Sequence, residues 1–294
     1  MDTAKPTDAN TAAVVQSRVA LPHGVHLHCA RRAGQEGKPT LLMLHGYADS
    51  SYAFMPLLEH LPPVYPVLLP SLRGHGQSDK PARYYEEDFV ADIQALIALL
   101  ELDNIVLIGH SMGSFFARQL ALQLPEICCA LVLIGSATRL GQAGAQGLHQ
   151  AVQQAVIDYS LSTALTPTAD AAAQTQMPLT FIQGLQASIA SRIDAATLAR
   201  LAQESQQAPV FVWQRLLEHL GALDHRALLE HISQPTLLLW GDQDPLFGAE
   251  EQDWLEQHIP RLQRITYLGN GHAPQLEHPV AVARDILRFV QQIA

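Results

Sequence analysis

Short apolar runs alternate along the chain with segments of helical periodicity. Runs without a polar interruption are typical of strands that are buried on both faces of a parallel sheet. The clearest of them are Thr40 to Leu44, Val64 to Leu69, Ile105 to Ile108, Leu131 to Ile134 and Thr236 to Trp240. Helical patterns lie between them; after Asp88, for example, apolar residues occupy positions 89, 90, 93, 96, 97 and 100. The alternation predicts an α/β fold with a mostly parallel, doubly wound sheet.

Weaker patterns complete this sheet. Arg18 to Leu21 and Val25 to Arg31 read as two antiparallel edge strands that turn around Pro22-His23-Gly24. Gln263 to Leu268 predicts a last strand, and a helix from about Val280 to Ile293 closes the chain. With the five runs above, these segments predict an eight-stranded sheet. Residues 1–17 contain no apolar core of the length of a signal peptide, and we expect them to form a flexible tail.

The strand–helix rhythm breaks between residues 137 and 230. This segment is rich in Ala and Gln and has no strand-like run, but it contains helical patterns, for instance Val210, Trp213, Leu216, Leu217 and Leu220. A helical interruption of an α/β pattern predicts an inserted lid. The chain therefore divides into a core domain, residues 18–136 and 231–294, and a helical cap, residues 137–230.

One strand of the core leads directly into a turn that carries chemistry. Ile105 to Ile108 is followed by Gly109-His110-Ser111-Met112-Gly113, and Phe116, Leu120 and Leu124 then repeat at helical spacing. A strand, a sharp turn and a helix with a serine at the apex form a nucleophile elbow. Side chains at positions 109 and 113 would collide with neighbouring segments, which explains the glycines. The helix N-terminus behind Ser111 offers backbone amides to a developing oxyanion.

Two later strands end in the residue types that such a serine needs. Thr236 to Trp240 is followed by Gly241-Asp242-Gln243-Asp244, and Gln263 to Leu268 by Gly269-Asn270-Gly271-His272. In open α/β sheets, ligands bind at the carboxyl ends of the strands. A serine hydroxyl needs a base, which histidine can supply, and a carboxylate fixes the tautomer of the imidazole. Serine, acid and histidine also follow in the chain order of the nucleophile-elbow hydrolases.

With these motifs, residues 18 to 294 resemble an α/β-hydrolase-fold protein with a helical cap. The matching motifs also include His45-Gly46-Tyr47 and the loop from Arg73 to Asp79, which we interpret as structural. The resemblance implies that Ser111 is the nucleophile, His272 the base and Asp244 the acid, with Asp242 as the rival for the acid. It also implies that the backbone amides of Tyr47 and Met112 form the oxyanion hole, and that the enzyme needs no cofactor.

Several histidines and aromatic residues outside these motifs are further candidates for metal binding or for lining a pocket. His23, His26 and His28 could suggest a metal site, but no further ligands stand nearby in the sequence, so we predict no metal. His45 and His110 flank the elbow and are expected to shape the site. In the insertion, Tyr159, Met177, Phe181 and Trp213 are candidates for lining an apolar pocket or for packing within the cap.

Composition limits the class of function. Apolar residues make up 48% of the 294 residues and charged residues 16%, which is typical of a globular protein. The net charge of −10 argues against nucleic-acid binding, and no segment is apolar enough to span a membrane. The three cysteines predict buried free thiols in a reducing compartment, so we expect a cytoplasmic protein.

The favoured function is therefore a serine hydrolase that cleaves a carboxylic ester or lactone of a small-molecule substrate through an acyl-enzyme. A serine at position 111 disfavours membership of the epoxide hydrolase and haloalkane dehalogenase branches of the fold, which need an aspartate at that position. Hydrolysis of thioesters or of carbon–carbon bonds uses the same triad and stays open. Two further alternatives are a cofactor-free haloperoxidase- or dioxygenase-like enzyme and a ligand-sensing receptor of this fold.

Overall fold

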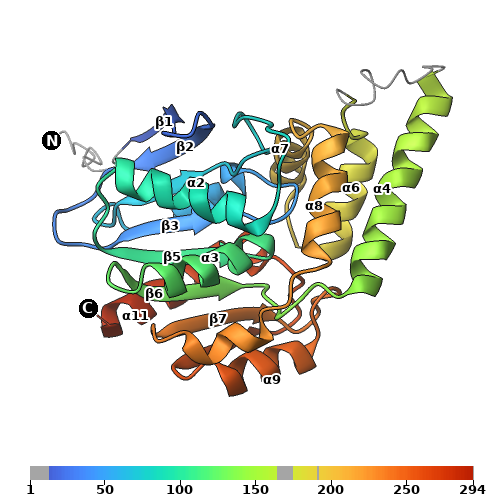
Figure 1. Ribbon diagram of the computed structural model, residues 1–294. Helices are drawn as coiled ribbons and strands as arrows, with labels where there is room; N and C mark the ends of the chain where they lie inside the picture. Colours follow the sequence, from blue (N-terminus) through green and yellow to red (C-terminus); the bar gives the residue numbers. More distant parts are fainter. Residues whose placement is uncertain (1–12, 164–174, 191, 294) are drawn as a thin grey trace, which may run out of the picture.

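The structure, a computed structural model, describes residues 13–163, 175–190 and 192–293. Its centre is one eight-stranded sheet in the order β1-β2-β4-β3-β5-β6-β7-β8, shown in Figure 1. β2 pairs antiparallel with β1 and with β4, and every pair from β4 to β8 is parallel. The predicted mostly parallel sheet is therefore confirmed. The strands are β1 (Val14–Ala20), β2 (His26–Arg32), β3 (Thr40–Leu44), β4 (Val67–Pro70), β5 (Ile105–His110), β6 (Cys128–Ile134), β7 (Thr236–Gly241) and β8 (Leu262–Tyr267).

The first strand begins earlier than the sequence predicted. β1 starts at Val14, not at Arg18, and it pairs with β2 from Val14 opposite Arg32 to Ala20 opposite His26. Residues 14–17 therefore belong to the sheet, and only residues 1–12 of the expected tail lie outside the described residues. Val15 is 61% exposed, so this edge strand is held by backbone pairing more than by an apolar face. Its hydrophobic pattern is too weak to mark its start.

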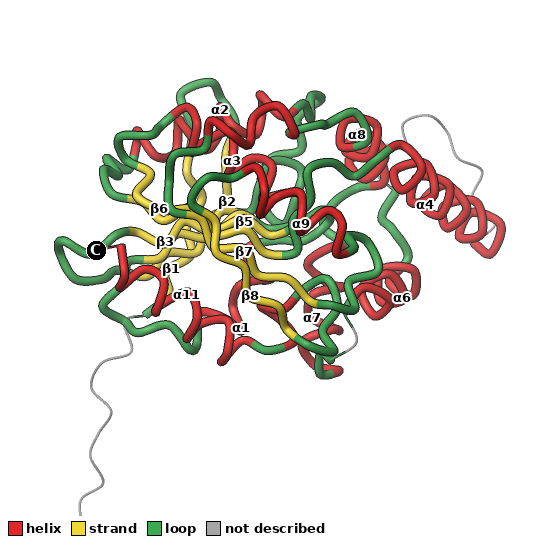
Figure 2. The backbone as a smooth tube through the Cα atoms, turned by 90° about the horizontal axis from the view of Figure 1, so that it is seen from below, coloured by secondary structure: helices red, strands yellow, loops and turns green. Residues whose placement is uncertain are grey.

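Helices cover both faces of the sheet, as Figure 2 shows. Successive strand residues point to opposite faces, so Leu107 packs in one core cluster while Val106 and Ile108 pack in the other. The first face is covered by α2 (Glu86–Leu99), α3 (Met112–Gln123) and α9 (Ala249–His258), the second by α1 (Met55–Leu58) and α11 (Pro279–Ile293). Three shorter helices, η1 (Ser51–Phe54), η2 (Arg226–His231) and α10 (Pro274–Glu277), connect these elements.

Between β6 and β7, the described residues form four α-helices ahead of the short η2. They are α4 (Gln142–Thr163), α6 (Leu179–Ile189), α7 (Ala195–Ser205) and α8 (Val210–Leu220), and we call them the inserted helices. In Figure 1 they stand together at one end of the sheet, with α4 packed against α8 and α6 against α7. The helical pattern predicted for α8 is present, since Val210, Trp213, Leu216, Leu217 and Leu220 are all buried.

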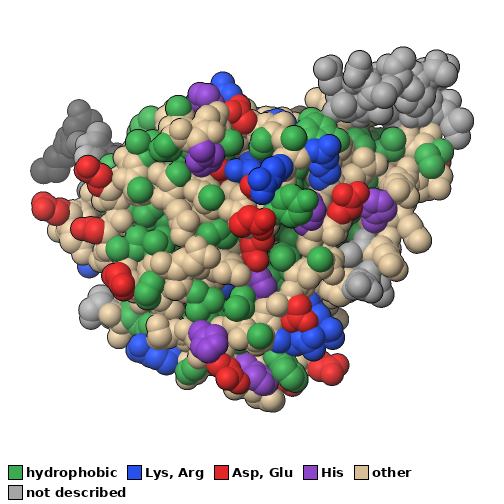
Figure 3. Space-filling view, in the orientation of Figure 1, with side chains coloured by type: hydrophobic (Ala, Val, Ile, Leu, Met, Phe, Trp, Pro, Cys, Tyr) green, Lys and Arg blue, Asp and Glu red, His purple; other side chains and the backbone are tan. Residues whose placement is uncertain are grey.

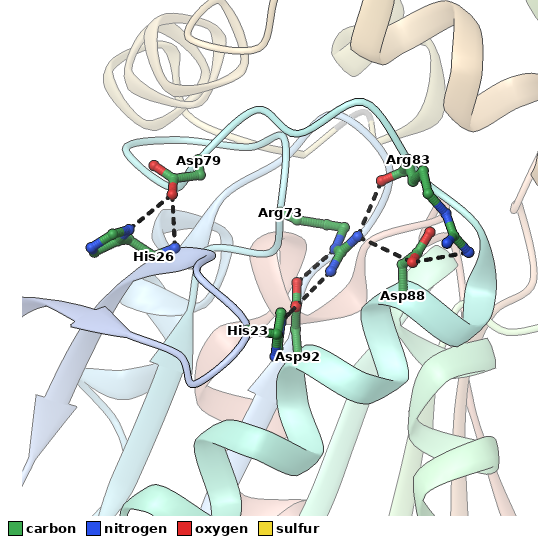
Figure 4. A network of polar contacts seen from close by, with 7 residues as sticks. All are labelled: His23, His26, Arg73, Asp79, Arg83, Asp88 and Asp92. Atoms are coloured by element: carbon green, nitrogen blue, oxygen red, sulfur yellow. Dashed lines mark hydrogen bonds and ion pairs between the residues drawn. The ribbon is translucent and has the colours of Figure 1, made fainter.

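An ionic network fixes the loop between β4 and α2 (Figure 4). Arg73 contacts both carboxylate oxygens of Asp92 at 2.6 Å, and His23 approaches the same carboxylate at 2.7 Å. Asp79 accepts hydrogen bonds from the backbone and the ring of His26, at 2.8 and 3.0 Å. The loop from Arg73 to Asp79 is thereby tied both to the turn between β1 and β2 and to α2.

Cysteines and surface charges complete the description. All three cysteines are free; Cys29 and Cys128 are buried, but Cys129 is exposed, contrary to the prediction. Cys129 lies next to Cys128 at the start of β6, where successive side chains point in opposite directions. On the face of the molecule seen in Figure 3, acidic and basic side chains lie close together at several places. No helix among the described residues is long and apolar enough to cross a membrane.

Candidate active site

Ser111 lies at the apex of a strained turn between β5 and α3. Its backbone has φ +49° and ψ −118°, a conformation that side-chain-bearing residues rarely adopt, and strain of this kind is concentrated at functional sites. The turn requires the glycines at either side. A Cβ at Gly109 would lie 2.5 Å from the carbonyl oxygen of Gly113, and one at Gly113 would lie 2.2 Å from that of Leu44. The local sequence thus permits this approach of α3 to β3 and β5.

His272 and Asp244 come together from the loops that follow β8 and β7. Nδ1 of His272 lies 2.8 Å from Oδ2 of Asp244, and both side chains are almost completely buried. The other carboxylate oxygen accepts hydrogen bonds from the amides of Leu246 and Phe247, at 2.8 and 3.2 Å. The two loops touch closely at Gly241, where a Cβ would lie 2.2 Å from the carbonyl oxygen of Gly271.

The partner of His272 fixes which of its nitrogens carries the proton. An ionised carboxylate only accepts hydrogen bonds, so Nδ1 donates to Asp244 and Nε2 presents a lone pair. Nε2 is buried and has no hydrogen-bond partner among the described residues. His272 and Ser111 line the same cavity. The imidazole is therefore in the tautomer that can accept a proton.

Asp242, the rival carboxylate, is used elsewhere. Its Oδ1 accepts a hydrogen bond of 2.6 Å from the amide of Gly269, which fixes the turn after β8. Of the two acids after β7, it is Asp244 that contacts the imidazole.

The backbone amides of Tyr47 and Met112 are free to bind an anion. Neither donates a hydrogen bond to another described residue, and Met112 is the first residue of α3, where no acceptor exists within the helix. Tyr47 and Met112 line the same cavity as Ser111. Ala48, after Tyr47, has φ +60°, a second strained residue beside the cavity.

This cavity has a volume of about 380 Å³, within the range of small-molecule sites. Its floor is formed by residues at the carboxyl ends of the core strands, and its walls by the inserted helices. α6 contributes Ile182, Leu185, Gln186 and Ile189, and α8 contributes Trp213, Leu217 and Leu220. The carbonyl oxygen of Ile189, the last residue of α6, accepts a hydrogen bond of 2.6 Å from the amide of His272. The inserted helices thus contact the histidine loop directly.

The four pocket candidates from the insertion have different positions. Trp213 lines the cavity, whereas Met177 is fully buried in the core, and Phe181 packs edge-on against Trp213 without lining the cavity. The side chain of Tyr159 lies outside what the structure describes. Asp49 and Gln186 also lie on the cavity wall, and neither was predicted from the sequence. For Asp49 a signal was present, because it follows the carboxyl end of a predicted strand.

The two histidines that flank the site lie in different environments. His45 is fully buried outside the cavity; its Nδ1 donates to the carbonyl oxygen of Gly46, and its Nε2 accepts from the amide of Leu72, at 2.8 and 2.9 Å. Burial lowers its pKa well below the usual value. His110 lines the cavity, and burial lowers its pKa to about 3. Both rings are therefore neutral at neutral pH.

Two of the three histidines of the first hairpin, His23 and His26, pair with separate carboxylates, while the backbone amide of His28 donates to the hydroxyl of Ser78. His23 contacts Asp92 and His26 contacts Asp79, both within the network of Figure 4. Among the residues that the structure describes, no three His, Cys, Asp or Glu side chains are grouped to hold a metal ion.

Comparison with known proteins identifies the family. A family model of the α/β hydrolase fold matches residues 39–279. The chain belongs to the α/β hydrolase fold family. Several relatives are named as esterases or as an epoxide hydrolase, and hydrolysis is the activity that this membership supports.

Individual relatives agree on hydrolysis but differ in substrate. The chain is 30% identical to a pimeloyl-[acyl-carrier protein] methyl ester esterase of Aromatoleum aromaticum over 258 residues, which cover 85% of this chain and 99% of the relative. It is 27% identical to epoxide hydrolase 4 of Mus musculus over 273 residues, 88% of this chain and 75% of that protein. An esterase structure from Exiguobacterium antarcticum matches with a TM-score of 0.80 at 19% identity, covering 94% of this chain and 100% of the esterase. At that identity the structural match shows the fold alone.

Proposed function

We propose that the protein is a cofactor-independent serine hydrolase that cleaves a carboxylic ester or lactone. The observation that carries the proposal is the contact between His272 and Asp244, which leaves Nε2 of the imidazole without a partner among the described residues, while His272 and Ser111 line one cavity. A relative of 30% identity named as a methyl ester esterase supports an ester as the substrate. Similarity to an epoxide hydrolase does not favour that chemistry, because Ser111 stands where that branch needs an aspartate.

In the proposed reaction, Ser111 Oγ attacks the ester carbonyl while Nε2 of His272 takes the hydroxyl proton. The oxyanion is bound by the amides of Tyr47 and Met112. The bond between the carbonyl carbon and the alcohol oxygen then breaks, and His272 returns the proton to the leaving alcohol. Water, deprotonated by His272, attacks the acyl-enzyme and releases the carboxylic acid and free Ser111. Asp244 holds the imidazole in the productive tautomer and stabilises its charged form.

The inserted helices act in this proposal as a cap. Most of the residues that they contribute to the cavity are apolar, so the cap surrounds the substrate with a dry wall in which electrostatic interactions are strengthened. The hydrogen bond from His272 to Ile189 couples the end of α6 to the histidine loop. Substrate preference is therefore assigned to the cap and chemistry to the core.

The test is hydrolysis of p-nitrophenyl esters of graded acyl length. We expect the rate to rise with chain length until the cavity is filled and to fall beyond that length. Ser111→Ala and His272→Ala should each lower kcat by roughly 10⁴-fold or more. Both variants should unfold at temperatures close to that of the wild type.

Matched controls use residues outside the cavity. Ser188 is an exposed serine of α6, and His258 a half-buried histidine at the end of α9. Ser188→Ala and His258→Ala should retain turnover within about twofold of the wild type, since surface substitutions rarely perturb a site. Ester hydrolysis by Ser111→Ala at the wild-type rate would refute the mechanism.

A further inference from the structure

The cavity has a polar character that the proposed reaction does not use. Apart from the proposed triad, several wall side chains carry hydrogen-bond donors, but their hydrogens are already engaged by the protein. The Tyr47 hydroxyl donates to the carbonyl oxygen of Trp213 at 2.9 Å, and the Trp213 indole donates to that of Ala208 at 3.1 Å. The Ser205 hydroxyl donates to the carbonyl oxygen of Leu201 at 2.9 Å. These groups offer no free hydrogen to a ligand.

Gln186 is left with an unused acceptor. Because the hydrogen of Ser205 is engaged, the hydroxyl can only accept from the Gln186 amide, whose Nε2 lies 3.0 Å away. This contact fixes the orientation of the amide. Oε1 of Gln186 is buried and has no hydrogen-bond donor among the described residues. A buried acceptor without a donor costs about 1–3 kcal/mol, which a ligand that donates to it would recover.

Asp49 presents a second unused acceptor. Its side chain is 15% exposed, lines the cavity and accepts no hydrogen bond from any described residue. The nearest ring nitrogen is Nδ1 of His110, 3.9 Å from Oδ2. Nε2 of His110 lies 3.2 Å from the carbonyl oxygen of His272 and must donate to it, so Nδ1 of the neutral ring is a lone pair. Asp49 therefore faces an acceptor and not a donor.

No cation compensates for this arrangement on the wall. No Lys or Arg is among the residues that line the cavity in the part of the chain that the structure describes. Burial raises the pKa of Asp49 to about 7, against a smaller opposing effect of His272. The carboxyl thus has no hydrogen-bond donor among the described residues, and a bound donor or cation would stabilise its charged form.

We propose that Asp49 and Gln186 form an acceptor subsite that binds an amino or hydroxyl group on the acyl part of the substrate. The same wall disfavours substrates that carry a carboxylate, because their binding would place a second negative group near ionised Asp49 with no Lys or Arg on the described wall to compensate. The inference rests on the proposed ester hydrolysis and narrows its substrate class. Asp49 lies two residues after Tyr47, whose amide is proposed to bind the ester oxyanion, so the subsite belongs close to the scissile carbonyl.

The test compares methyl pentanoate with its 2- and 3-hydroxy and 2- and 3-amino derivatives and with monomethyl glutarate. Each kcat/KM is divided by the rate constant of that ester with hydroxide, because the substituents change intrinsic reactivity. For the wild type we expect a preference of roughly tenfold or more for at least one hydroxy or amino ester over methyl pentanoate. Monomethyl glutarate should be the poorest substrate of the series.

Variants assign the preference to the subsite. Asp49→Ala should reduce the ratio of donor-bearing to plain ester to about one. Asp49→Asn keeps an acceptor oxygen but removes the charge, so it should lose the preference for amino esters and retain most of that for hydroxy esters. Gln186→Leu, which keeps the side-chain volume, should lower the ratio severalfold. Asp253→Asn, a carboxylate-to-amide change at an exposed pair with Arg264, should leave the ratio unchanged.

The outcomes separate the two proposals. If p-nitrophenyl pentanoate is not hydrolysed in a Ser111-dependent way, the proposed function fails. If it is hydrolysed but the wild type shows no preference, if Asp49→Asn keeps a wild-type preference for amino esters, or if Gln186→Leu keeps the wild-type ratio, the acceptor subsite is refuted. Because Asp49→Ala could fail to fold, melting temperatures are measured for every variant, and Asp49→Asn and Gln186→Leu decide the question independently.

Discussion

The two carboxylates after β7 are used differently, although only one residue separates them. Asp244 contacts the imidazole of His272, whereas Asp242 accepts from the amide of Gly269. We predict that Asp244→Asn lowers kcat by about 10³–10⁴-fold, because an amide does not hold the productive tautomer. Asp242→Asn keeps an acceptor oxygen and should stay within about threefold of the wild type. Steady-state kinetics on one p-nitrophenyl ester give kcat for both variants. An equal decrease in kcat for Asp242→Asn and Asp244→Asn would contradict the assignment of Asp244 as the acid.

Asp49 should couple stability to pH. Burial raises its pKa in the folded protein to about 7 from an ordinary value of 3.8. The protonated form is therefore favoured by folding, and the stability that it contributes is fully present below pH 3.8 and is lost as the pH rises towards 7. The side chain of Asp49→Asn cannot ionise. We therefore expect the free energy of unfolding of this variant to increase relative to that of the wild type as the pH rises from 4 to 7.

This relative increase in the free energy of unfolding should amount to roughly 1–4 kcal/mol, because each unit of pKa shift corresponds to about 1.4 kcal/mol. Above pH 7 the difference should stay constant. Urea unfolding at several pH values measures it, with Asp253→Asn as the control for an exposed carboxylate. A stability difference between Asp49→Asn and the wild type that does not change with pH would show that Asp49 ionises normally.

At the scale of elements, the elbow was predictable because its constraints are local. A buried strand, two glycines and an amphipathic helix fix the position of Ser111 within about ten residues of sequence. β1 was less predictable, since its start depends on pairing with β2 and not on its own pattern. The position of Asp49 after a predicted strand gave a signal, but its neighbours could not be predicted, because they include His110 and helices more than a hundred residues away in sequence.

The two kinds of glycine in this fold should respond in opposite ways to alanine. At Gly113 a Cβ would lie 2.2 Å from the backbone of Leu44, which cannot move without shifting β3. We expect Gly113→Ala to destabilise by about 3 kcal/mol or more, or to prevent folding. At Gly184, an exposed position of α6, an added Cβ would meet no neighbouring group within 4 Å. Gly184→Ala should stabilise by roughly 0.5–1 kcal/mol.

Thermal and urea unfolding of both variants provide the measurement. The pair is matched in chemistry, since each adds one methyl group to a helical glycine. A tolerated Gly113→Ala would mean that the elbow can open, and the strain at Ser111 would then lose its structural reason.

At the scale of the whole molecule, the cavity is lined both by strand ends, which the sequence predicts well, and by the inserted helices, which it predicts poorly. Ser111, Asp244 and His272 all lie at the carboxyl ends of parallel strands, where ligands are expected to bind in open α/β sheets. The shape and lining of the cavity depend instead on how α6 and α8 pack over these strand ends. A helical pattern gives the buried face of a helix but not the neighbour that it buries against, so Gln186 could not be assigned to the wall.

The network of Figure 4 links three parts of the molecule that are distant in sequence: the β1–β2 turn, the loop after β4, and α2. Its centre is the bidentate pair of Arg73 and Asp92, whose side chains are 5% and 2% exposed. Removing Asp92 leaves Arg73 with only its longer ion pair to Asp88, at 3.5 Å, and breaking a buried pair costs about 3–5 kcal/mol. We therefore expect Asp92→Ala to lower the free energy of unfolding by about that amount.

His23 contacts the same carboxylate from a position that is 40% exposed, so solvent screens its contribution. His23→Ala should cost less than about 1 kcal/mol. Urea unfolding compares the two variants, and hydrogen exchange locates the effect. In Asp92→Ala the amides of β1, β2 and the Arg73 to Asp79 loop should exchange faster together, because Asp92 makes the shortest contacts that hold both Arg73 and His23 to α2. Independent exchange of the hairpin and the loop, or equal costs for the two substitutions, would show that the network does not act as a unit.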